Sequence, residues 1–108
     1  MLTAVAEEPA APVPIAPFLT QNYPNPFNPI TRIPYRLAAT DRLRLRILNA
    51  AGQRVRTLVD GERRAGFHQV AWDGRDGRDR DLASGLYLYR PEAERSGFSQ
   101  TRSMLLAR

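Results

Sequence analysis

The fold is indicated by residues 31–47, TRIPYRLAATDRLRLRI, in which apolar and polar side chains alternate along two runs. Because successive side chains of a β-strand point to opposite faces, each run predicts a strand with one apolar and one solvated face. Pro34 cannot donate a ladder hydrogen bond, so the first strand is expected at a sheet edge, or unpaired at that position. The apolar faces comprise Thr31, Ile33, Tyr35 and Leu37 in the first strand and Leu43, Leu45 and Ile47 in the second.

Further short runs follow, separated by turn residues. The turn predicted at residues 49–52, NAAG, has an Asn side-chain acceptor and a Gly that accepts positive φ. The return strand, from Arg54 to Val59, is expected to end at the turn pair Asp60-Gly61. Residues 86–90, LYLYR, are apolar at nearly every position and predict a central strand covered on both faces. The last strand is expected from about Phe98 to Leu106.

This succession of short strands, with no helical period in any segment, predicts an all-β fold. The expected architecture is an immunoglobulin-like antiparallel β-sandwich of about seven strands. Its core is expected to bury a set of alternating apolar residues, namely Ile33, Tyr35, Leu43, Leu45, Ile47, Val70, Trp72 and Tyr87.

The chain of 108 residues suits a single domain. Residues 1–17, MLTAVAEEPAAPVPIAP, are rich in Ala and Pro and predict a linker, and residues 18–108 are expected to form the sandwich. Such a linker implies a further domain upstream. Cysteine is absent, which excludes a disulfide framework and a thiolate metal site. No stretch approaches the roughly 20 apolar residues of a transmembrane helix, and a signal peptide is expected to lie elsewhere.

The net charge of +5 comes entirely from arginine, because the sequence contains no lysine. Guanidinium groups pair with carboxylates and phosphates, so this charge would attract an acidic cell surface or a nucleic acid. The arginines, however, mostly interleave with apolar residues, as on the solvated face of a strand. We therefore expect no nucleic-acid partner.

No residue pattern predicts catalysis. His68 is the only histidine, and no serine or acidic pair stands at a recognised catalytic spacing from it, so we expect no catalytic residue and a packed or semi-exposed histidine. The four aspartates of residues 73–81, DGRDGRDRD, suggest calcium ligands, but the interleaved arginines favour a self-neutralising turn. Trp72, Tyr87 and Tyr89 suggest sugar stacking, although core positions are favoured. No metal or cofactor is expected.

Residues 22–29, NYPNPFNP, form a proline-rich segment that is stiff because each proline fixes φ. One interpretation is that this segment crosses an end of the sandwich while Tyr23 and Phe27 plug the core. The other is a preformed extended strip whose exposed Asn and Tyr groups meet a translocon or receptor.

The same segment, followed by Thr31, Ile33, Tyr35 and Leu37, closely resembles the opening of the C-terminal sorting domains of the type IX secretion system. The related immunoglobulin-like domain of flagellar hook-capping proteins is similar in its later half. The resemblance spans about residues 19–108. Its later matches are residues 52–58 (GQRVRTL), 65–66 (AG) with His68, 72–74 (WDG), 83–85 (ASG) with Tyr87 and Tyr89, and 101–106 (TRSMLL).

Three positions depart from the pattern. Asp79 stands where glycine is usual and is expected to accept positive φ. Pro91 is expected to end its strand early. Ser103 replaces a basic residue that is common in the terminal segment.

The resemblance implies a non-catalytic C-terminal module that directs a larger bacterial protein through the periplasm to the medium or the cell surface. Its partners would be the outer-membrane secretion machinery or a cell-surface attachment partner, with a catalytic or binding domain upstream. The alternatives are a passive immunoglobulin-like structural or assembly domain of the hook-capping kind and a carbohydrate-binding module. The candidate recognition residues are Asn22, Tyr23, Asn25, Phe27, Asn28, Arg102 and Arg108.

Overall fold

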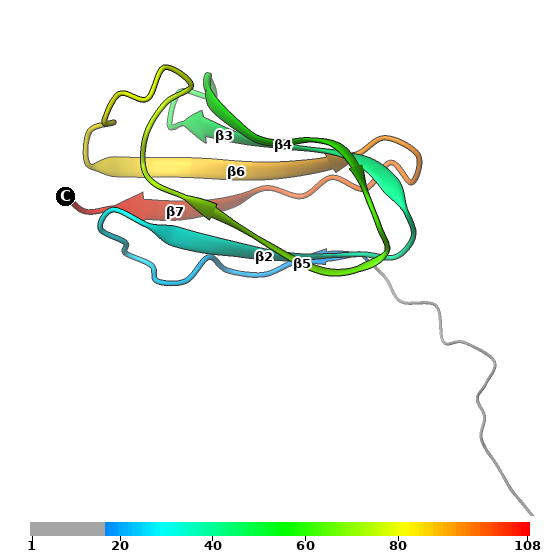
Figure 1. Ribbon diagram of the computed structural model, residues 1–108. Coiled ribbons are helices and arrows are strands. Elements are labelled where there is room, and N and C mark those ends of the chain that lie inside the picture. Colours follow the sequence, from blue (N-terminus) through cyan, green and yellow to red (C-terminus); the bar gives the residue numbers. More distant parts are fainter. Residues whose placement is uncertain (1–16) are drawn as a thin grey trace, which may run out of the picture.

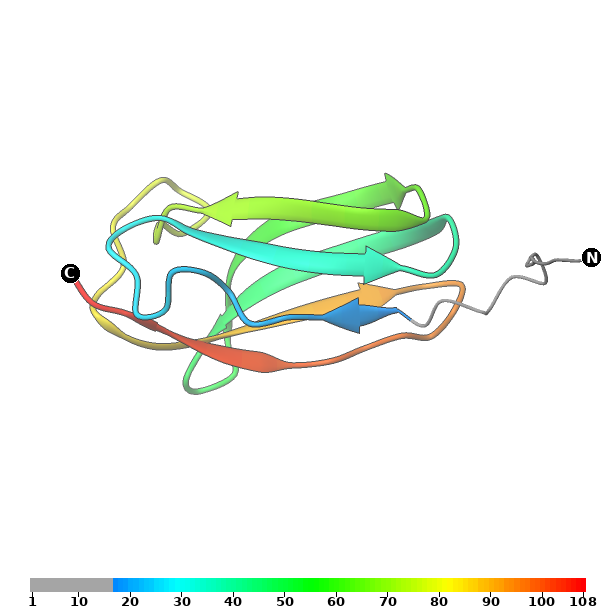
Figure 2. The same cartoon turned by 90° about the horizontal axis from the view of Figure 1, so that it is seen from below.

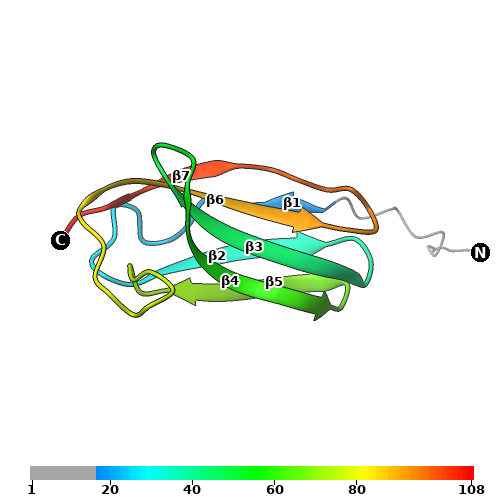
Figure 3. The ribbon, with the colours of Figure 1, turned by 90° about the horizontal axis from the view of Figure 1, so that it is seen from above.

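The computed structural model describes residues 17–108, and the expected linker, apart from Pro17, lies outside them. Two antiparallel sheets pack face to face (Figure 1), as the alternating runs predict. One sheet has the order β1-β2-β5 and the other the order β4-β3-β6-β7 (Figure 3). The strands are β1 (Phe18–Leu19), β2 (Thr31–Leu37), β3 (Asp41–Asn49), β4 (Arg54–Arg63), β5 (Gly66–Trp72), β6 (Gly85–Ala93) and β7 (Arg102–Leu106). Six strands have five or more residues, so the expected count of seven is reached only with the two-residue β1.

The core lies between the two sheets and includes seven of the eight residues expected from strand parity, Val70 being the exception. Trp72 is 1% exposed and packs against Phe27 and Tyr87, with ring centroids 5.6 and 5.5 Å apart. Val70 is only partly buried, because it lies on β5, the outer strand of the smaller sheet, and packs at the margin of the core. The confirmed core positions are Ile33, Tyr35, Leu43, Leu45, Ile47, Trp72 and Tyr87.

At Pro34, β2 is paired in a ladder with β5 but not with β1. Pro34 stands opposite Gln69 of β5, whereas the β1 ladder ends with Leu19 opposite Tyr35. The missing N–H of Pro34 therefore interrupts no ladder with β1, as expected for an unpaired position. The alternative expectation, an edge strand, is wrong because β2 lies between β1 and β5.

The turn from β3 to β4 forms as expected. The Asn49 side-chain oxygen accepts hydrogen bonds from the backbone N–H groups of Ala51 and Gln53, and Gly52 has φ 84°. The expected turn at Asp60-Gly61 is wrong, because β4 continues to Arg63. Asp60 lies opposite Arg44, and the two side chains face each other with an N–O distance of 3.9 Å, so cross-strand charge pairing favours a strand there.

Two predictions for β6 and one for β7 are corrected. β6 does not end before Pro91, which is buried and lies opposite Leu45 of β3. The ladder between β6 and β7 stops at Tyr89, so the missing N–H of Pro91 removes no hydrogen bond to β7. β6 is central but is covered on one face only, since Leu86 is 48% exposed. β7 begins at Arg102 rather than near Phe98. Residues 94–97 reverse the chain, and the carbonyl of Phe98 accepts a hydrogen bond from the N–H of Ala93 in β6.

Candidate recognition surface

Residues 22–29, here called the strip, connect the two sheets along one side of the sandwich. Near its start, Tyr23 exchanges two backbone hydrogen bonds with Arg32 of β2, with N–O distances of 2.9 and 2.8 Å. Farther along, the N–H of Phe27 donates to the carbonyl of Leu105, and the N–H of Ala107 donates to the carbonyl of Phe27. Figure 2 shows the strip between β2 and β7. The strip therefore covers part of the outer edge of β7.

Two strip residues, Asn22 and Phe27, are buried and hold the strip in place. The backbone N–H of Asn22 donates to the Tyr89 hydroxyl group, and its side-chain nitrogen donates to the hydroxyl oxygen of Thr31, each at 2.9 Å. Burial raises the pKa of Tyr89, so its hydroxyl group stays protonated and donates in turn to the carbonyl of Thr20. Phe27 is 1% exposed and packs against Trp72.

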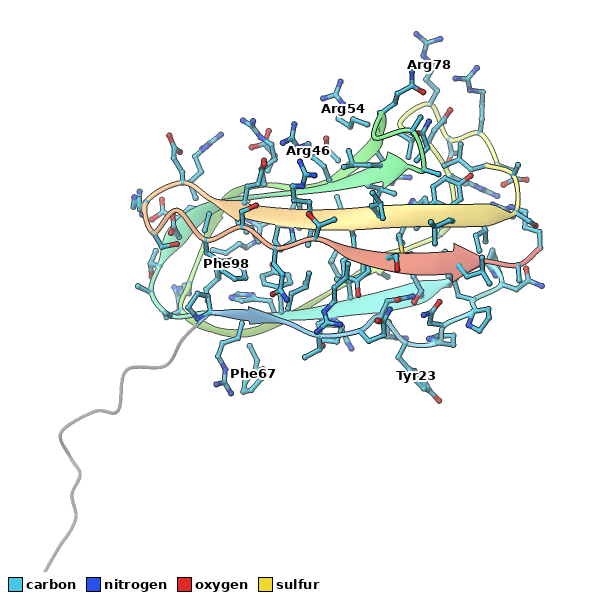
Figure 4. All side chains as sticks on the ribbon, turned by 180° about the vertical axis from the view of Figure 1, so that it is seen from behind. Tyr23, Arg46, Arg54, Phe67, Arg78 and Phe98 are labelled. Atoms are coloured by element: carbon cyan, nitrogen blue, oxygen red, sulfur yellow. The ribbon has the colours of Figure 1, made fainter. Side chains whose placement is uncertain are left out.

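Three other strip residues, Tyr23, Asn25 and Asn28, face solvent. Tyr23 is 73% exposed and projects outward (Figure 4), so the expectation that it plugs the core is wrong. It forms a backbone bridge with Arg32, which lies on the outward face of β2, while the neighbouring Asn22 faces inward. The strip is also built of bends and isolated bridges rather than extended backbone, with cis peptide bonds before its three prolines.

The two arginines at the end of the chain bind backbone groups of this domain. The Arg102 Nε donates to the carbonyl of Leu19, at 3.1 Å. The Arg108 guanidinium donates to the carbonyls of Gly74 and Leu82 and lies 3.6 Å from the Asp81 carboxylate. Both side chains therefore connect β7 and the segment that follows it to other parts of the fold. Their role in contacting a partner stays a prediction.

The candidate residues thus fall into two groups. Tyr23, Asn25 and Asn28 are exposed, while the others are buried or bonded within the domain. Sequence reasoning missed Tyr89 as the residue that anchors the strip, because a tyrosine in an apolar run gives no sign of its hydroxyl partners. Asn25 has a double role, since its side-chain oxygen accepts a hydrogen bond from the N–H of Leu105.

The other residues considered as catalytic or metal-binding candidates, His68 and the aspartates of residues 73–81, make contacts within the domain. His68 is partly buried, stacks on Tyr35 with ring centroids 5.1 Å apart, and lies 2.7 Å from the Arg64 carbonyl. In the acidic loop, Arg75 pairs with Asp79 and Asp81, which confirms ion pairing within the loop. Asp79 has φ 63°, as its glycine-like position predicted. Residues 17–108 contain no group of three or more His, Cys, Asp or Glu side chains arranged to hold a metal ion.

The sequence of residues 31–97 matches the FlgD Ig-like domain family. The chain belongs to this family. The match begins at β2, so it leaves out the strip and β7 of this FlgD Ig-like domain. No curated protein sequence matches the chain significantly.

Three solved structures share the fold of this FlgD Ig-like domain. Dimeric latent PorU from Porphyromonas gingivalis has a TM-score of 0.67 and 16% identity, over 96% of this chain and 10% of PorU. FlgD from P. aeruginosa has a TM-score of 0.58 and 18% identity, over 71% of this chain and 60% of FlgD. PorZ, an essential surface component of the type IX secretion system of P. gingivalis, has a TM-score of 0.56 and 20% identity, over 82% of this chain and 11% of PorZ.

The chain therefore spans a tenth of PorU, a ninth of PorZ and three fifths of FlgD. Within residues 17–108 no helix has the length and apolar character needed to cross a membrane.

Proposed function

We propose that this domain is a non-catalytic module that directs the secretion and cell-surface attachment of a larger bacterial protein. The observation that carries the proposal is the docking of the strip on β7. Backbone hydrogen bonds join Phe27 to Leu105 and to Ala107, which lie about eighty residues away in the sequence. The two segments with the sorting-domain signature thus share one surface, which exists only in the folded domain.

Within this surface we assign two kinds of role. Tyr23, Asn25 and Asn28 face solvent and are proposed to contact the outer-membrane secretion machinery or the attachment partner. An aromatic ring flanked by amide groups offers both contact area and hydrogen-bonding groups, as is common at protein interfaces. The remaining candidates, namely Asn22, Phe27, Arg102 and Arg108, are proposed to position this surface.

Recognition of a folded module explains why the contact residues stand on a rigid framework. Asn22 and Phe27 fix the strip at two points, so its exposed side chains lose less conformational freedom when a partner binds. The protein would pass through the periplasm, with its catalytic or binding domain upstream of this module. PorZ, which shares the fold, is described as a surface component of a type IX secretion system.

The test is a fusion of the whole 108-residue chain to the C-terminus of a periplasm-directed reporter, in a bacterium with a type IX secretion system. We expect the reporter at the cell surface or in the medium. The same fusion in a strain without a working system should stay in the periplasm. Retention of a folded fusion in the strain with the system would overturn the sorting function.

The second candidate is a passive structural or assembly domain. The membership of residues 31–97 in the FlgD Ig-like family favours it, since that match does not include the strip or β7. In this case the fusion would fold and stay in the periplasm, and substitutions at exposed strip residues would have no effect on its location.

A further inference from the structure

A cleft of about 730 Å³ lies between β4 and the loop of residues 73–84, which joins β5 to β6. Four arginines line this cleft, Arg54 and Arg56 from β4 and Arg78 and Arg80 from the loop. Asp76 is the carboxylate among the lining residues. The cleft lies on the larger sheet and its loop, away from the strip's bridge to β2, and the inference does not depend on the proposed function.

Hydrogen bonds fix the loop beside β4. Val55 lies at a β-bulge, where β4 has an extra residue relative to β3, and its carbonyl accepts a hydrogen bond from the N–H of Gly77, at 3.0 Å. The Arg56 guanidinium donates to the carbonyls of Arg75 and Asp76, at 3.1 and 3.3 Å. The arginines of the loop are therefore held next to those of the strand.

The Asp76 carboxylate is already occupied by partners within the loop. One oxygen accepts hydrogen bonds from the backbone N–H groups of Arg78 and Arg80, at 2.9 and 3.0 Å, and the other accepts from the Arg80 side chain, at 3.0 Å. The backbone N–H of Arg80 is the main reason that the pKa of Asp76 lies below its usual range. The Asp76 carboxylate therefore forms its ion pair with Arg80 and does not neutralise the other arginines of the cleft.

Arg54 and Arg78 carry the unbalanced charge. Both side chains are exposed, and within residues 17–108 no carboxylate oxygen lies within 4.0 Å of either guanidinium group. Figure 4 shows them projecting on the same side of the molecule, one from β4 and one from the loop. The guanidinium groups of Arg54 and Arg78, which have no acceptor within residues 17–108, thus line the same cleft as those of Arg56 and Arg80, whose acceptors belong to the protein.

We propose that this cleft binds a phosphate group, with Arg54 and Arg78 as its principal ligands. A guanidinium group presents several N–H donors in a planar fork that fits the oxygens of a phosphate. A single carboxylate carries one charge and needs one such fork, whereas a phosphate monoester carries about 1.5 to 2 negative charges at pH 7 and pyrophosphate carries more. A phosphate therefore matches two arginines that line one cleft better than a carboxylate does. The phosphate could belong to a soluble compound or to a lipid headgroup.

The test is a titration of the full chain with inorganic pyrophosphate at low ionic strength, followed by NMR of the backbone amides. We expect saturable shifts centred on Gly77, Arg78 and Arg80. A parallel arm measures binding to phosphatidylcholine vesicles with and without phosphatidic acid. Binding to pyrophosphate alone indicates a soluble ligand, and additional or sole binding to the acidic vesicles indicates a lipid phosphate. Absence of saturable binding in both arms would overturn the proposal.

The double variant Arg54→Ala/Arg78→Ala should weaken binding by about tenfold or more, because it removes both unpaired guanidinium groups. Arg54→Lys, which keeps the charge without the fork, should be intermediate. Arg64→Ala is the matched control for the single variant Arg78→Ala: this exposed arginine follows the far end of β4, and each of these two changes lowers the net charge by one. If Arg64→Ala weakens binding as much as Arg78→Ala, binding reflects the overall charge of +5 and the proposal fails.

Discussion

The Tyr89 hydroxyl oxygen lies 2.9 Å from the backbone nitrogen of Asn22, and this hydrogen bond ties the start of the strip to β6, an inner strand of the larger sheet. Asn22 is 3% exposed, so water does not readily replace the hydroxyl group as an acceptor. The Tyr89 hydroxyl group therefore helps to hold the start of the strip, together with the Thr31 hydroxyl group, which accepts a hydrogen bond from the Asn22 side chain.

Tyr89→Phe is expected to lower the free energy of unfolding by about 1–3 kcal/mol, because it leaves the buried N–H of Asn22 without an acceptor. Urea denaturation measures the change. Tyr23→Phe is the matched control, since Tyr23 is 73% exposed. Equal stability of Tyr89→Phe and the unchanged protein would show that the hydrogen bond does not hold the strip.

Trp72→Ala is expected to cost about 3–5 kcal/mol of stability, because it removes a large core side chain and leaves a cavity against Phe27 and Tyr87. The melting temperature reports this loss. An unchanged melting temperature would mean that Trp72 is not a core residue and would restore sugar stacking as a function for it.

The lowered pKa of Asp41 makes the stability of the fold dependent on pH. Burial tends to raise the pKa of the Asp41 carboxyl group, but hydrogen bonds from the N–H groups of Arg95, Ser96 and Arg42 outweigh this effect and lower the pKa. A lowered folded-state pKa stabilises the fold above the unfolded-state value, about 3.9, and this contribution is lost as the pH falls through the folded-state pKa. Asp41→Asn should therefore lower the melting temperature near neutral pH and have less effect in acid. The same decrease at both pH values would contradict this assignment.

Gly74→Ala is expected to destabilise the domain by about 2 kcal/mol or more, because Gly74 has φ +74°. An added Cβ would also lie 2.8 Å from an Arg108 side-chain nitrogen and 3.3 Å from the carbonyl oxygen of Pro29. Gly77→Ala is the control within the same loop, since a Cβ there meets nothing within 4 Å. If both variants melt at the same temperature, the close packing of Arg108 and Pro29 against Gly74 does not contribute to stability.

The sheet faces could be predicted from sequence because a period of two residues is a local property. Ile33 and Leu45 are fully buried, as their parity indicates. The strand ends were harder to predict. Asp60-Gly61 has the composition of a turn, but cross-strand pairing with β3 keeps it extended. Pro91 is tolerated because the ladder between β6 and β7 does not extend beyond Tyr89.

The arrangement of the candidate surface could be predicted only in part. The strip was recognised from its prolines and its resemblance, but the inward Asn22 and the outward Tyr23 depend on contacts with Tyr89 and Arg32, distant in sequence. The loop of residues 73–81 was expected to neutralise its own charge. Arg78 departs from this, because Asp76 bonds the Arg78 backbone and not its side chain.

If exposed strip residues are recognised during export, the exported fraction of the reporter fusion should depend on Tyr23 and Asn28, which the double variant Tyr23→Ala/Asn28→Ala replaces. We expect this fraction to fall by about tenfold, the effect of losing about 1.4 kcal/mol of interface free energy from the two side chains together, with no change in melting temperature. Phe67→Ala with Gln69→Ala, also exposed on the smaller sheet, is the matched control and should be exported normally. Normal export of the strip variant, or equal loss in the control, would contradict the account.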